Sequence, residues 1–325
     1  MAASTPVLEG TPQSRARSFA YGLKAGDELA YVLTLAAASA VILIVALLVY
    51  QLWISSRLPI HKFGFSFLTG RTWDPNAGDF GALPFVFGTC VTSALALIVA
   101  VPVGVGAAIF LAELAPPKTS NALTFLIELL AAVPSVIYGL LGIFILVPLI
   151  RQYLAPALRD VFGFLPLFQG PFYGVSFLSA GVVLVIMVVP FIISVSREVL
   201  MAVPVEQREA ALALGATRWE STWDIVIPNA STGIIGSGFL ALARALGETM
   251  AVTMVIGNTP QITASLFAPG YSIAAVIANE FTEATGDLYL SSLVFLGLVL
   301  FGLTILINAF ARILILTTQR KGAQS

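Results

Sequence analysis

The sequence predicts an all-α, polytopic membrane protein with six transmembrane helices. Of its 325 residues, 58% are hydrophobic and 10% are charged, and the mean hydropathy is +0.96. Soluble domains carry about 25% charged residues, so this chain lacks the polar surface that water requires. A helix needs about 20 apolar residues to cross the hydrocarbon core of a bilayer. Six such segments occur, at about 29–53, 84–112, 121–150, 174–200, 230–257 and 288–316.

The distribution of lysine and arginine predicts the orientation, because cytoplasmic loops carry an excess of these residues. With the N-terminus inside, the inner segments hold ten: Arg15, Arg17, Lys24, Lys118, Arg197, Arg208, Arg218, Arg312, Arg320 and Lys321. The outer segments hold five: Arg57, Lys62, Arg71, Arg151 and Arg159. We therefore expect a cytoplasmic tail (1–28), a transmembrane domain (29–316) with outer loops at 54–83, 151–173 and 258–287, and a second cytoplasmic tail (317–325).

The sequence contains few groups for metal or cofactor chemistry. Cys90 is the single cysteine and His61 the single histidine, too few ligands of these types for a zinc or iron–sulfur site. The phosphate-binding motif G-x-x-x-x-G-K-[ST] is absent, because no lysine follows a glycine. We therefore expect no enzymatic activity, metal or cofactor on this chain, and the energy source should lie on another chain.

A polar insert between the fourth and fifth spans, residues 203–228, has the composition of a docking loop. Pro204 suits the first position of a helix, and helix-favouring residues follow it. Gly215 suits the left-handed position that ends a helix, and Thr217 with Glu220 forms a capping box for a second helix. The expected structure is a short helix, a glycine turn and another helix, with the first too short and too charged to span.

The spacing in this insert resembles the cytoplasmic loop of permease subunits in ABC importers. That pattern is E-A-A, three residues, glycine, nine residues and I-x-L-P, and isoleucine replaces its leucine here. The matching residues are Glu209, Ala210, Ala211, Gly215, Ile225, Ile227 and Pro228. The resemblance implies the type I ABC importer permease fold, with Glu209, Ala210, Ala211 and Gly215 coupling the chain to an ATPase subunit. The alternative is an ordinary amphipathic surface helix.

Arg244 and Glu248 lie inside the fifth predicted span, with Arg244 near its middle. Residues four positions apart share one face of a continuous helix. An arginine at the bilayer centre costs at least about 2.5 kcal/mol, and such residues almost always face a bundle interior or a wet cavity. The pair is either an internal salt bridge or an anion-binding site on a translocation path. We favour the path, because desolvation offsets most of the Coulomb gain of a buried ion pair.

Further stretches resemble the PstC family of phosphate importer permeases. They are 67–85, AIFLAELAP (108–116), AAVPSVIYG (131–139), RALGETMAV (244–252) and 257–281. The resemblance covers the second to sixth spans and implies a multi-pass protein of the bacterial plasma membrane. It also implies a PstA-like second permease, a PstB-like ATPase dimer that binds ATP and Mg²⁺, and a PstS-like external phosphate-binding protein. No nucleic acid is expected as a partner.

Phosphate fits the chemistry of these residues. Arginine presents a planar fork of donors that binds two oxyanion oxygens at once. Ionised Glu248 would accept the proton of a protonated phosphate and repel an unprotonated oxyanion such as sulfate. Ser135 and Tyr138 follow Pro134, where we expect a kink, and would offer hydroxyl donors. We therefore expect Arg244, Glu248, Ser135 and Tyr138 to contact the substrate on its path.

The outer segment 272–284 is too short to span and is predicted to form an amphipathic helix with Ser272 as its cap. It is either a docking surface for the external binding protein or a lid packed over the bundle. Three other functions stay open at this point. They are a permease for phosphonate, sulfate or molybdate, a membrane sensor of phosphate, and an ion-driven carrier.

Overall fold

The computed structural model describes residues 27–322, in two compact units that comprise residues 1–54 and 55–325. The predicted tail at 1–28 therefore lies almost wholly outside the described residues, as do residues 323–325. Within the described part, six helices are long and apolar enough to cross a membrane. They are Ala30–Ser55, Leu83–Leu114, Ser135–Phe162, Phe177–Met201, Arg218–Leu246 and Asp287–Phe310. The predicted all-α class and six spans are confirmed.

The first unit consists, as far as the structure describes it, of helix α2 (Asp27–Ser55) up to Ile54. From Ala30 onward this helix has no charged residue, and its apolar stretch is not buried inside the chain. A helix that is apolar on every side has no face suited to water. Lipid or another membrane helix is therefore its fitting environment.

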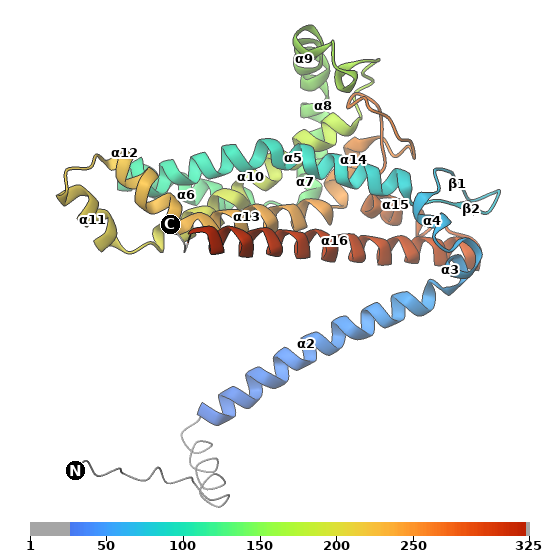
Figure 1. Ribbon diagram of the computed structural model, residues 1–325. Helices are drawn as coiled ribbons and strands as arrows, with labels where there is room; N and C mark the ends of the chain where they lie inside the picture. Colours follow the sequence, from blue (N-terminus) through green and yellow to red (C-terminus); the bar gives the residue numbers. More distant parts are fainter. Residues whose placement is uncertain (1–26, 323–325) are drawn as a thin grey trace, which may run out of the picture. The chain divides into compact units, whose positions relative to one another are not determined.

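The second unit contains the remaining elements (Figure 1). Its long helices are α5 (Leu83–Ile109), α10 (Phe177–Met201), α13 (Ile227–Leu246) and α16 (Asp287–Gly322). The shorter ones are α3 (Arg57–Phe63), α4 (Ser66–Thr69), α6 (Pro117–Ala131), α7 (Ser135–Leu141), α8 (Val147–Leu149), α9 (Ala155–Phe162), α11 (Val205–Ala213), α12 (Arg218–Ser221), α14 (Met250–Ile256) and α15 (Ile273–Glu280). π-Helical turns lie at Phe110–Leu114, Gly142–Leu146, Ile150–Leu154 and Thr222–Val226, and a 3-10 turn lies at Pro166–Phe168.

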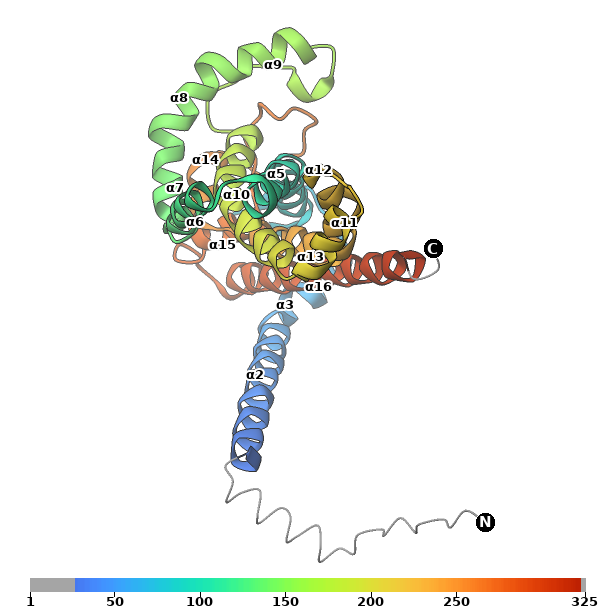
Figure 2. The same cartoon turned by 90° about the vertical axis from the view of Figure 1, so that its left-hand side faces the viewer.

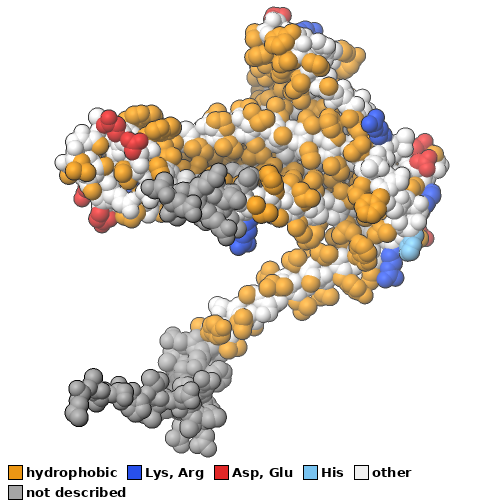
Figure 3. Space-filling model, in the orientation of Figure 1, with side chains coloured by type: hydrophobic (Ala, Val, Ile, Leu, Met, Phe, Trp, Pro, Cys, Tyr) orange, Lys and Arg blue, Asp and Glu red, His pale blue; other side chains and the backbone are white. Residues whose placement is uncertain are grey.

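The core of this unit forms where α10 packs along α5 and α13. Small residues permit close contact, because an added methyl group at Gly104 would overlap Ile192 and one at Gly181 would overlap Leu95. Close packing of small residues is a main source of helix association where lipid removes the hydrophobic driving force. Hydrophobic side chains cover the long helices, whereas acidic side chains gather at the α11 end and at the hairpin end (Figure 3).

The third predicted span, 121–150, differs from the observed structure. Helix α6 ends at Ala131 and a separate helix begins at Ser135, directly after Pro134. Proline disfavours helical conformation in the residue before it and lacks a backbone donor, which accounts for the break. The new helix continues through two π-helical turns and α8 to the end of α9, and it leaves the bundle as an arm (Figures 1 and 2).

The fifth predicted span, 230–257, is also interrupted. Helix α13 ends at Leu246, Gly247 follows as its cap, and α14 begins only at Met250. Arg244 therefore occupies the last turn of α13 and not the middle of an unbroken helix, which corrects the sequence prediction. A cation in the last turn is favoured there by the partial negative charge of the helix C-terminus.

The outer loop predicted at 54–83 contains ordered structure. Strands β1 (Trp73–Asp74) and β2 (Asp79–Phe80) pair antiparallel, with Trp73 opposite Phe80. The Trp73 indole donates a hydrogen bond of 2.8 Å to the Glu280 carboxylate, which also accepts one of 2.6 Å from the Tyr289 hydroxyl. One carboxylate thus ties the hairpin to α15 and α16.

Helix α15 confirms the helix predicted within 272–284, and Ser272 caps it by accepting a hydrogen bond of 3.2 Å from the Ala275 amide. Its first turn is buried against α5, α14 and α16. The amide of Ile273 donates to the Thr89 hydroxyl of α5 at 2.9 Å. These contacts favour the packed lid over an exposed docking helix.

Candidate translocation and coupling sites

The predicted coupling loop has the expected form. Helix α11 carries Glu209, Ala210 and Ala211, and none of its residues is buried. Gly215 has a φ of +92°, and this left-handed conformation is one that a side chain disfavours. Thr217 and Glu220 form the capping box that opens α12. The loop thus presents an exposed helix at one end of the bundle (Figures 1 and 2).

Arg208 of α11 connects this exposed helix to the membrane domain. Its Nη2 and Nε donate to the two carboxylate oxygens of Glu113, at 2.9 and 3.2 Å, and its guanidinium also donates to the carbonyls of Leu200 and Val203. The Arg208 and Glu113 side chains are 18% and 10% exposed. Glu113 lies in the π-helical turn that ends the second span, and Leu200 lies at the end of α10, so α11 is linked to two spans at once.

Arg244 projects from the last turn of α13 and is exposed in the isolated chain. Its guanidinium lies over the Phe191 ring of α10, 5.5 Å from the ring centre. A cation over an aromatic face gains about 0.5–1 kcal/mol at an exposed site and leaves its N–H donors free. No hydrogen bond or ion pair within the described part of the chain occupies Arg244, so its fork of donors is available to an anion.

Glu248 does not pair with Arg244 in the described structure. The helix ends between the two residues, so they do not share a helix face as the sequence predicted. The Glu248 carboxylate accepts a hydrogen bond of 3.2 Å from the Ala251 amide and so caps the first turn of α14. One carboxylate oxygen is held by this bond, and the side chain is half-buried.

Tyr138 and Ser135 lie on α7, which packs against α14. The two helices approach closely there, because a side chain at Gly139 would overlap Met254 and touch Ala251. Helix α13 ends at Leu246 and α14 begins at Met250, so the end of α13 lies beside the same helix. The structure therefore gathers the first turn of α7, the end of α13 and the start of α14 in one region.

The Tyr138 hydroxyl has a structural partner as well. It donates a hydrogen bond of 2.6 Å to the Leu130 carbonyl and so bridges the break between α6 and α7. Its proton is thereby engaged in this conformation, and only its oxygen lone pairs remain for another group. Ser135 is half-buried at the start of α7. The substrate-binding roles of both residues stay predictions.

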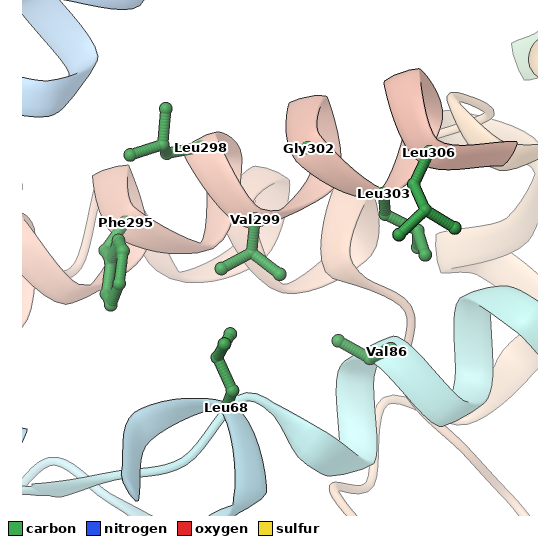
Figure 4. A pocket seen from close by; sticks show the side chains of 8 residues that line it. All are labelled: Leu68, Val86, Phe295, Leu298, Val299, Gly302, Leu303 and Leu306. Carbon is green, nitrogen blue, oxygen red and sulfur yellow. The ribbon is translucent and has the colours of Figure 1, made fainter. Parts of the chain in front are cut away.

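Large apolar cavities lie away from this region. The cavity of Figure 4, about 410 Å³, is lined by α16 with Leu68 and Val86 facing it, and no charged residue borders it. A second, of about 470 Å³, contains the stacked rings of Trp219 and Trp223 and also has no charged lining. Neither suits an anion, because burying an unpaired charge among apolar groups is costly.

Sequence reasoning did not identify the contacts of Arg208 and Phe191. A basic residue directly before the E-A-A motif and an acidic one at the end of the second span were the available signals for the Arg208–Glu113 pair. Their pairing depends on a contact between residues 95 positions apart, which no local pattern reveals. Phe191 is one of 22 phenylalanines, and nothing in its immediate sequence distinguishes it.

The chain matches known proteins along most of its length. The family described as "Binding-protein-dependent transport system inner membrane component" matches residues 100–318. The "Phosphate transport system permease protein PstC" of Mesorhizobium japonicum is 45% identical over 96% of this chain and 95% of that protein. The protein of the same name from Xylella fastidiosa is 47% identical over 89% of this chain and 90% of that protein.

Two solved structures share the fold at low sequence identity. A bacterial ABC transporter involved in the import of the acidic polysaccharide alginate has a TM-score of 0.56 and 16% identity, over 90% of this chain and 98% of that chain. The inward-facing MetNI methionine ABC transporter has a TM-score of 0.52 and 16% identity, over 76% of this chain and 99% of that chain.

The fold is that of a type I ABC importer permease, a multi-pass inner-membrane transport subunit that acts within a larger complex. By its sequence, the chain belongs to the family of binding-protein-dependent transport system inner membrane components and, within it, groups with the PstC permeases. The family resemblance inferred from the sequence motifs is confirmed.

Proposed function

We propose that this chain is a permease subunit of an ATP-driven phosphate importer and forms the translocation path together with a second, PstA-like permease. Two observations support this. Relatives that are 45–47% identical over about nine-tenths of the chain or more are named phosphate permeases. Arg244 offers a free, fixed guanidinium in a region where three helix ends meet.

Arg244 would hold phosphate briefly between the two permeases. Its guanidinium provides two parallel N–H donors, which match two phosphate oxygens. The cation–π contact with Phe191 fixes its position without using these donors. Glu248 would accept the proton of a protonated phosphate on its remaining oxygen, and Ser135 and Tyr138 would line the same path. Binding has to be weak enough for release.

Energy would come from a PstB-like ATPase dimer, which binds ATP and Mg²⁺. In this proposal α11 enters a groove on one ATPase subunit, with Glu209, Ala210, Ala211 and Gly215 forming the contact. Closure of the ATPases on ATP would move α11, and Arg208 would pass this movement to the second span through Glu113. Both termini would then lie in the cytoplasm, and a PstS-like protein would deliver phosphate on the outside.

The observation that carries the proposal is the free guanidinium of Arg244. We expect Arg244→Gln, in the assembled transporter, to lower uptake of radiolabelled phosphate by about 100-fold, because two charge-assisted hydrogen bonds of roughly 1.5 kcal/mol each are lost. Arg312→Gln, which removes an exposed charge from α16, should transport normally. Normal uptake by Arg244→Gln would refute the proposal, and inhibition of uptake by sulfate as strong as by phosphate would favour another oxyanion.

A further inference from the structure

A second basic site lies on the arm formed by α7, α8 and α9. The arm leaves the bundle, and residues 163–172 then turn back toward it (Figures 1 and 2). Between the arm and the returning segment is a pocket of about 450 Å³, lined by Arg151, Arg159, Asp160 and Phe172 among others. Unlike the apolar cavities, it brings two guanidinium groups to one space.

A π-helical turn brings the two arginines to the same face. Residues eight positions apart on a regular α-helix diverge by about 80° around the axis. The π-helical turn Ile150–Leu154 winds fewer degrees per residue and removes most of this divergence. Such turns are frequent at functional sites. The backbone therefore places Arg151 and Arg159 on one side of the arm.

Arg159 is held in place before any ligand binds. Its Nη2 donates a hydrogen bond of 2.6 Å to the Gly170 carbonyl, and its guanidinium lies 5.6 Å from the centre of the buried Phe267 ring. That ring packs edge-on against Phe172 of the pocket wall. The returning segment is itself anchored, because the Ser265 hydroxyl donates to the Gln169 carbonyl at 2.6 Å.

Arg151 and Asp160 are exposed and form no hydrogen bond or ion pair with other described residues. Two arginines and one aspartate give the pocket a formal charge of +1. This balance favours a singly charged anion over a doubly charged one. Arginine forks pair best with the coplanar oxygens of carboxylate and phosphate groups, and the two forks here can contact a phosphoryl group from two sides.

We propose that this pocket binds a singly charged phosphoryl group, either the phosphodiester of an anionic lipid headgroup or inorganic phosphate. The pocket is separate from the Arg244 region, because its lining residues lie between 151 and 172, on the outer part of the arm and on the returning segment. The free-phosphate source rests on the proposed transport function, whereas the headgroup source does not. Each basic residue near a lipid headgroup strengthens binding by about 1 kcal/mol, which is a factor of about five.

The test uses the purified full-length chain in nanodiscs. The lipid experiment uses native mass spectrometry to compare retention of phosphatidylglycerol with that of digalactosyldiacylglycerol, which has no phosphoryl group. The phosphate experiment measures binding of radiolabelled inorganic phosphate in nanodiscs made only of the galactolipid. Arg151→Gln is the principal variant, because Arg151 has no hydrogen bond or ion pair to lose within the described part of the chain. Arg71→Gln, which removes another exposed charge elsewhere, is the matched control.

We expect Arg151→Gln to weaken binding about fivefold in at least one of the two experiments. The double variant with Arg159→Lys should weaken binding further, and Asp160→Asn should strengthen it. Arg71→Gln should bind as the wild type does in whichever experiment shows the loss. Weaker binding in the lipid experiment identifies the headgroup as the ligand, and weaker binding in the phosphate experiment identifies the free anion. Equal binding by Arg151→Gln and wild type in both experiments would overturn the proposal, whatever Arg244→Gln does to transport.

Discussion

Arg208 holds Glu113 through two parallel hydrogen bonds, of 2.9 and 3.2 Å, and so joins the exposed helix α11 to the end of the second span. No residue of α11 is buried, and Arg208 reaches both the end of the second span and the end of α10. Bidentate arginine–carboxylate pairs resist changes in geometry more than a single hydrogen bond does. The contact therefore ties α11 to the bundle, and we predict that it transmits movement between them.

Glu113→Gln should uncouple ATP hydrolysis from transport. The substitution keeps the shape of the side chain but removes the charge that faces Arg208, at a cost of about 2 kcal/mol. We expect fewer phosphate ions imported per ATP hydrolysed by the complete transporter in proteoliposomes. Glu198→Gln, an exposed change in the last turn of α10, is the control. An unchanged ratio in Glu113→Gln would show that the pair does not transmit the movement.

Gly215→Ala should destabilise the coupling loop. Its φ of +92° is unfavourable for alanine, so we expect a loss of about 1 kcal/mol in the free energy of unfolding of the loop and weaker ATPase binding. Co-purification of the ATPase with the permease measures the effect. Gly236→Ala, in a helical position with nothing within 4 Å, should be neutral or slightly stabilising. Equal ATPase binding by both variants would argue against a structural need for glycine at 215.

Glu248→Gln separates the two roles of that side chain. An amide oxygen can still accept the Ala251 hydrogen bond, so α14 should keep its cap. The negative charge is lost, and with it the repulsion of unprotonated oxyanions. We expect competition by sulfate for phosphate uptake to increase in this variant. Full retention of phosphate-over-sulfate discrimination would eliminate Glu248 as the selective group.

Tyr138→Phe distinguishes structure from substrate binding at α7. Loss of the hydrogen bond to the Leu130 carbonyl should lower stability by about 1 kcal/mol, measured as a lower Tm in detergent. If the hydroxyl also contacts phosphate, the KM for phosphate uptake should rise. A lower Tm with an unchanged KM would leave Tyr138 with its structural role alone.

Some features were predictable because their causes are local. The number of spans, the glycine turn at Gly215 and the capping box at Thr217 follow from neighbouring residues, and the structure confirms them. The breaks at Pro134 and Gly247 were missed as helix ends, since apolar residues on both sides extended the hydropathy signal through them. Placing Arg244 at a span midpoint was wrong for this reason.

The amino-acid sequence by itself determined the solvent of this protein, its number of spans, its coupling motif and its family, because composition and short spacing record all four. Only the tertiary structure decided the partners of its charges: Glu113 for Arg208, the Phe191 ring for Arg244, the Ala251 amide for Glu248 and Gly170 for Arg159. The reason is physical. A charge in a low-dielectric bundle is stabilised by whatever dipoles and rings folding brings to it, and those groups come mostly from distant helices.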